Sequence, residues 1–91
     1  MEVSQSMSEY LLKSKLSPCV QIINRVESNY IWNGLFKKSS EHIILIKCKS
    51  KKLKEISTYI QENHNYDTPE IIALDIDILN DNYRKWFDEN C

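Results

Sequence analysis

The residues best suited to chemistry lie in one short run between an amphipathic segment and an apolar one. The run is His64-Asn65-Tyr66-Asp67-Thr68-Pro69-Glu70. The imidazole of His64 is an ordinary ligand for copper or zinc, but a useful metal site needs further donors. The chain has no Cys-x-x-Cys and no His-x-x-x-His spacing. Two interpretations of His64 therefore stay open: a metal ligand, or a residue that caps a helix end or bonds within a loop.

The carboxylates of this run suggest a second kind of chemistry. Asp67 and Glu70 lie close in the sequence, and paired carboxylates can perform acid–base work. The chain, however, offers no nucleophile–base pair and no glycine-rich phosphate loop. We therefore predict that it is not an enzyme, and a hydrolase that uses these two residues is the least favoured alternative.

Two aromatic residues and three cysteines complete the candidates. Tyr30 and Trp32 are two positions apart, so both point to one face of a strand. We expect them to pack in a core or a subunit interface rather than to stack on a ligand.

Cys19 and Cys48 have apolar neighbours and are expected to pack in the core, whereas Cys91 is expected to be exposed. The odd number of cysteines leaves at least one thiol unpaired, which fits a reducing, cytoplasmic compartment.

Hydrophobic periodicity predicts the elements that position these residues. The expected helices cover residues 2–16, residues 50–63 with Ser50 as the N-cap, and a short stretch that begins at Asn80 or Asp81. In the last helix, Tyr83, Trp86 and Phe87 are expected to face inward.

Branched and aromatic residues predict four strands, over residues 19–23, 27–36, 42–48 and 71–78. The polar residues 37–40 are predicted to turn a long antiparallel hairpin. Residues 42–48 are apolar on both faces and predict a central strand, and residues 43–78 predict a right-handed strand–helix–strand crossover. The sequence thus predicts an α+β fold.

Composition limits the classes of function. The chain of 91 residues is predicted to form one domain, 1–91, with a modest core. A net charge of −1 argues against a nucleic-acid partner, and a local lysine cluster at positions 47–54 is expected to be a solvated face. The longest apolar stretch, residues 43–46, is far shorter than the ~20 residues of a membrane helix, and the N-terminus lacks a secretory pattern.

Several segments together resemble the CutA divalent-ion tolerance family, in order and in spacing. They are Leu16-Ser17-Pro18-Cys19-Val20, Ser28-Asn29-Tyr30-Ile31-Trp32-Asn33-Gly34, the strand beginning at Glu41, the run from His64 to Ile72, and Asn82-Tyr83-Arg84-Lys85-Trp86-Phe87. The resemblance covers essentially the whole chain. It implies a ferredoxin-like βαββαβ subunit with an added C-terminal helix, assembled as a homotrimer by strand pairing between neighbours.

The resemblance also implies a function in the tolerance or binding of divalent metals, copper in particular, without turnover. His64 matches one histidine of a pair that some members use for metal. In the implied trimer, Tyr66, Asp67, Glu70 and Glu41 would line a polar cleft between subunits. The alternative is a signalling or scaffold trimer like the P-II proteins, which bind small effectors in such clefts.

The chain departs from the family pattern at two places. Asn65 stands where the family has proline. The family's first strand is missing as well, because Met1 falls where the first helix should begin, and with it goes a cysteine implicated in metal binding in some members. We therefore expect a truncated or divergent member that is stabilised by oligomerisation or by re-paired strands.

Overall fold

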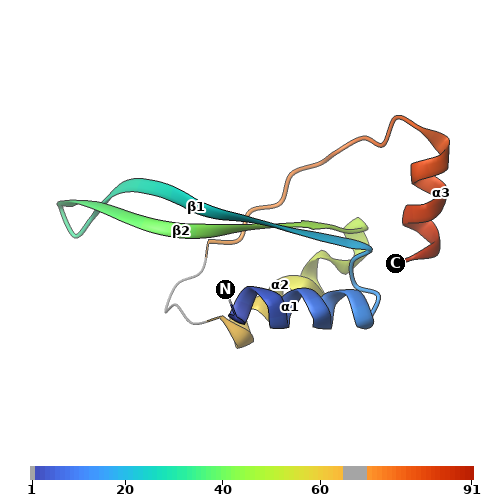
Figure 1. Ribbon diagram of the computed structural model, residues 1–91, viewed down its shortest axis with the longest axis horizontal. Helices are drawn as coiled ribbons and strands as arrows, with labels where there is room; N and C mark the ends of the chain where they lie inside the picture. Colours follow the sequence, from blue (N-terminus) through green and yellow to red (C-terminus); the bar gives the residue numbers. More distant parts are fainter. Residues whose placement is uncertain (1, 65–69) are drawn as a thin grey trace.

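The computed structural model describes residues 2–64 and 70–91. The elements are α1 (Glu2–Lys13), β1 (Cys19–Trp32), β2 (Leu35–Lys47), the short 3-10 helix η1 (Ser50–Lys52), α2 (Leu53–Asn63) and α3 (Asp81–Glu89). The two strands form one long antiparallel hairpin. As Figure 1 shows, α1 and α2 lie together on one side of the hairpin, and α3 lies near its open end, where β1 begins and β2 ends.

The core is small and lies between the two helices and the base of the hairpin. Its buried centre consists of Leu11, Leu16 and Ile56. The half-buried residues Val20, Ile46, Cys48, Tyr59 and Ile60 pack around it. Met7 and Leu11 are four residues apart in α1 and both are buried, whereas Tyr10 is exposed.

A capped turn joins α1 to β1. Lys15 has a positive φ of 59°, and the N–H groups of Leu16 and Ser17 donate to the Leu11 carbonyl at 3.0 and 3.2 Å. This left-handed closure satisfies a carbonyl that the end of the helix would otherwise leave unpaired. The fully buried Ser17 hydroxyl donates to the carbonyl oxygen of Lys47, so the turn is also attached to the end of β2.

The hairpin turns at Asn33 and Gly34, and the predicted turn over residues 37–40 is wrong. Asn33 and Gly34 have φ values of 52° and 77°, and Trp32 pairs directly with Leu35. Two consecutive left-handed residues make the tight turn whose twist suits a hairpin, and an Asn-Gly sequence adopts it readily. The polar residues 37–40 instead belong to β2, where both faces meet solvent.

A bulge joins two stretches that were predicted as separate strands. Ile23 pairs with Ile43 and Val26 pairs with Glu41, so two residues of β1 stand opposite His42 alone. The second bulge residue, Arg25, has a φ of 60°. Because a bulge bends and twists a strand without ending it, residues 19–32 remain one element.

The predicted strand over residues 71–78 is also wrong. Figure 1 shows residues 70–80 as an extended stretch, and they pair with no strand among the described residues. Residues 42–47 lie in β2, which has one partner strand there rather than the two of a central strand. The described chain therefore forms no strand–helix–strand crossover. Branched residues favour extended backbone, but a ladder also needs a neighbouring strand to bond with. Ser50 begins η1 and is not the N-cap of α2, which is Lys52 without a side-chain cap.

The last helix agrees with its prediction except at Trp86. Asn80 is the N-cap residue, Phe87 is buried and Tyr83 is half-buried, but Trp86 is 42% exposed. The indole lies beside the Tyr83 ring, with centroids 5.5 Å apart.

Candidate functional site

The hairpin arm is the half of the hairpin beyond the bulge, residues 26–41, and it projects past the two helices (Figure 1). Its tip exposes four large apolar side chains, two from each strand: Ile31 66%, Trp32 56%, Leu35 60% and Phe36 67%. Ile31 pairs with Phe36, and the next pair joins Trp32 to Leu35, so the two pairs point to opposite faces. Both faces of the arm therefore present apolar surface to solvent.

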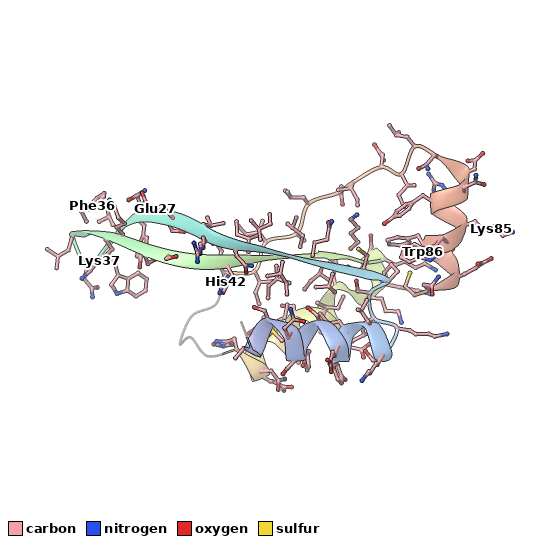
Figure 2. All side chains as sticks on the ribbon, in the orientation of Figure 1. Glu27, Phe36, Lys37, His42, Lys85 and Trp86 are labelled. Carbon is pink, nitrogen blue, oxygen red and sulfur yellow. The ribbon has the colours of Figure 1, made fainter. Side chains whose placement is uncertain are left out.

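Side chains alternate along the arm as the pleat requires. Figure 2 shows Phe36 and Glu27 on one side of the arm and Lys37 on the other. Tyr30 and Trp32 are two residues apart in β1 and share the Lys37 side, as their spacing predicted. Tyr30 is 41% exposed, so neither aromatic residue is packed in the core of this chain.

Two of the predicted interface residues meet through a serine on the arm. The Ser39 hydroxyl donates to Oε1 of Glu41 at 2.9 Å and lies 3.4 Å from the Tyr30 hydroxyl oxygen. The Ser28 hydroxyl donates to Oε2 of Glu41 at 3.2 Å. These bonds hold a half-buried carboxylate in one orientation, with both oxygens accepting hydrogen bonds.

The run from His64 to Glu70 is described only at its two ends. Tyr66 and Asp67 lie outside the described residues. Glu70 is exposed at the start of the extended segment, and within residues 2–64 and 70–91 no hydrogen bond joins it to Glu41. Of the four residues predicted to line a cleft between subunits, Glu41 and Glu70 are described, and the cleft itself stays a prediction.

The two histidines occupy different environments. His64 is the half-buried C-cap residue of α2, and its backbone N–H donates to the Ile60 carbonyl at 3.0 Å. This position is the helix-capping alternative predicted for it. His42 is exposed opposite the bulge and extends toward the side on which the helices lie (Figure 2).

A contact between α3 and the end of β2 was missed by the sequence analysis. Lys47 Nζ lies 3.4 Å from the Tyr83 hydroxyl and 5.5 Å from the centre of its ring, and Lys49 Nζ lies 3.8 Å from Asp88 Oδ1. Two of the five lysines of the predicted solvated face, Lys47 and Lys49, thus contact α3. The available signal was the spacing of Tyr83, Phe87 and Cys91, which recur every four residues on one face of the helix.

Two cysteines flank this contact. Burial raises the pKa of the Cys48 thiol, and a nearby charge on Cys91 raises it further. The Cys91 thiol donates to the Phe87 carbonyl at 3.1 Å, so it sits against the last turn of α3 and is half-buried rather than exposed. All three cysteines, including Cys19, are free.

Two further lysines lie beside a stacked aromatic pair formed by α1 and α2. The rings of Tyr10 and Tyr59 lie 4.2 Å apart at an interplanar angle of 10°. Burial, and then the neighbouring Tyr10, raise the pKa of Tyr59. Lys51 and Lys54 border the shallow hollow beside this pair.

No group of three or more His, Cys, Asp or Glu side chains that could hold a metal ion occurs within residues 2–64 and 70–91. In the same part of the chain, no helix is long and apolar enough to cross a membrane.

Comparison with known families places residues 1–90 under the description "CutA1 divalent ion tolerance protein". The protein CutA, chloroplastic, of Arabidopsis thaliana is 34% identical over 85 residues, which are 93% of this chain and 47% of the relative. This chain spans about half the length of the Arabidopsis and rice relatives that it matches.

Solved structures agree with this result. CutA1 from Oryza sativa is 31% identical and superimposes with a TM-score of 0.92 over 99% of this chain and 83% of the other. The divalent cation tolerance protein from Thermus thermophilus is 30% identical, with a TM-score of 0.90 over 98% of this chain and 86% of the other. The predicted α+β, ferredoxin-like fold class is confirmed.

Proposed function

Because this chain belongs to the CutA1 divalent ion tolerance family, we propose that it provides tolerance to divalent metal ions by binding them, copper in particular, without turnover. The observation that carries the proposal is the family match over residues 1–90, which leaves one residue of the chain outside. The same match supports a single CutA-like domain over residues 1–91.

The active form is a homotrimer in our proposal, and the hairpin arm is its main contact surface. Support comes from the apolar tip, where Ile31, Trp32, Leu35 and Phe36 are each more than half exposed. Exposed apolar clusters of this kind mark association surfaces in soluble proteins. Because both faces of the arm are apolar, one arm has surface for two neighbours.

The polar side of the interface is built around Glu41. Ser28 and Ser39 already fix this carboxylate within one chain, and Tyr30 lies beside it. We propose that Tyr66, Asp67 and Glu70 of a neighbouring copy complete a cleft with it. Such a carboxylate-lined cleft would select cations over anions.

His64 is the proposed metal ligand. His64 is the C-cap residue of α2 and precedes Asp67 and Glu70 in the sequence, and a neutral imidazole binds copper or zinc in proteins. Cytosolic residence is proposed as well, because a reducing compartment suits three free thiols. The Arabidopsis relative is named as chloroplastic, so fractionation is the way to check the compartment.

A growth assay tests the proposed function. A copper-sensitive bacterial strain is transformed with the chain, with His64→Ala, or with an empty vector, and grown in increasing CuCl2. We expect the native chain to extend growth to higher copper and His64→Ala to lose the benefit. Equal growth of all three strains would contradict the proposal.

Thermal-shift screening with nucleotides and small anions separates the metal-binding proposal from the P-II-like alternative. That alternative predicts stabilisation by an effector rather than by metal.

A further inference from the structure

The three cysteines of the chain gather at the open end of the hairpin. Cys19 begins β1 and stands opposite Lys47, the last residue of β2, and Cys48 follows directly. Cys91 follows α3, and Figure 1 marks the C-terminal end of the chain beside the same open end. All three thiols are free and half-buried. A bond between two of these sulfurs would therefore join elements that are distant in the sequence.

Cys48 lies between two residues that both contact α3. Lys47 Nζ is 3.4 Å from the Tyr83 hydroxyl oxygen, and Lys49 Nζ is 3.8 Å from Asp88 Oδ1. Tyr83 and Asp88 lie in the first and last turns of α3, so the contact runs along the helix. The backbone at Cys48 is thus held against α3 from both sides.

The Cys91 thiol reaches this contact from the end of α3. It donates to the Phe87 carbonyl at 3.1 Å, and Phe87 is a buried residue of the helix. Burial raises the pKa of the Cys48 thiol, and the charge of Cys91 raises it further. Because a charge acts on a partly exposed group only over a short distance, the two sulfurs are near neighbours.

The helix that carries Cys91 is weakly held. α3 has nine residues, fewer than the ~12–15 that an isolated helix needs to be stable in water. The side chains of its ion pair, Lys49 and Asp88, are 31% and 58% exposed, and such pairs contribute little to stability. A covalent tether beside this pair would therefore change how firmly α3 is docked.

We propose that Cys48 and Cys91 form a redox switch. Oxidation by a small disulfide, such as oxidised glutathione, joins their sulfurs and ties α3 to the end of β2, and reduction by excess thiol releases it. Disulfides in a reducing compartment are usually of this transient, sensing kind. This inference does not depend on metal binding.

The exchange balances with one glutathione disulfide. The Cys91 thiolate attacks one sulfur of oxidised glutathione, and one glutathione thiolate leaves. The Cys48 thiolate then attacks Cys91 Sγ in the mixed disulfide and displaces the second glutathione thiolate. The two protons of the protein thiols go to the two glutathione thiolates. Cys48 acts second because it packs against the core and its thiolate is the less favoured form.

The test treats the full, reduced chain with oxidised glutathione in the presence of EDTA, which removes copper as an oxidant. The intact mass should fall by the mass of two hydrogen atoms, and digestion without reductant should yield a disulfide between Cys48 and Cys91. The melting temperature should rise by roughly 10 °C. Hydrogen exchange should slow at the amides of α3, and excess dithiothreitol should reverse every change.

Matched serine variants locate the reaction. Cys19→Ser should respond as the native chain does, although Cys19 lies at the same end of the hairpin. Cys48→Ser and Cys91→Ser should each lose the rise in melting temperature. Cys91 lies outside the buried core cluster, so Cys91→Ser tests the pair even if Cys48→Ser unfolds.

Unfolded protein shows whether the fold selects this pair. In concentrated urea, loop closure favours the shorter loop between Cys19 and Cys48 over the longer one between Cys48 and Cys91. Native protein should reverse that preference. Three results would each overturn the proposal: no Cys48–Cys91 disulfide from native protein, the same mixture of disulfides with and without urea, or unchanged exchange at α3 once the disulfide has formed.

Discussion

Replacing Phe36 by serine should weaken self-association strongly while leaving the subunit folded. Phe36 is 67% exposed, and an aromatic side chain buries about 150–250 Å² when it is covered completely. A neighbouring copy could therefore remove roughly 130 Å² of apolar surface from water at this residue. At about 25 cal/mol per Å², the contact contributes ~3 kcal/mol, which corresponds to about a 100-fold change in the dissociation constant.

Light scattering over a range of protein concentrations measures this change. Native protein is expected to keep the mass of a trimer at concentrations where Phe36→Ser has dissociated. Lys38→Ser is the matched control, because Lys38 is exposed on the same strand and the same face but adds little apolar area. Circular dichroism should show equal helix content in all three proteins. A native monomer, or an unchanged mass for Phe36→Ser, would refute the role assigned to the arm.

Three further changes test the fold. Leu11→Ala removes a fully buried core side chain and should cost about 2–5 kcal/mol in urea unfolding, and a loss below 1 kcal/mol would mean that the core is elsewhere. Gly34→Ala should cost about 1–2 kcal/mol in the same assay, since the φ of 77° there disfavours a Cβ, and no loss would argue against the Asn-Gly turn. The raised pKa of Cys48 means that the folded chain favours the neutral thiol, so stability is complete below the ordinary thiol pKa and is lost as the pH rises through the raised value. Unfolding at pH 8 and pH 10 should show a larger alkaline loss for native protein than for Cys48→Ala, and equal losses would contradict the burial of this thiol.

The helices could be predicted from the sequence because their information is local. The apolar row through Met7 and Leu11 fixes the buried face of α1, and the same spacing places Ile56 in the core from α2. The aromatic residues of the arm were also placed correctly on one face, because alternation in a strand depends only on position.

The errors arose where structure depends on residues that are distant in the sequence. Residues 71–78 have strand composition, but their pairing needs a neighbour that the described chain does not place beside them. The Asn33-Gly34 turn was overlooked because the polar run at residues 37–40 gave a broader signal than two residues do. Lys47 and Lys49 look solvated in sequence because their partners, Tyr83 and Asp88, lie more than 30 positions away.

Calorimetric titration of CuCl2 into the purified protein tests the central claim most directly. The chain has only two histidines, so His42→Ala is a matched control for His64→Ala. Our account predicts that native protein and His42→Ala bind copper with the same affinity and stoichiometry, and that His64→Ala loses at least about tenfold in affinity. Equal binding by all three proteins, or loss in His42→Ala alone, would contradict it.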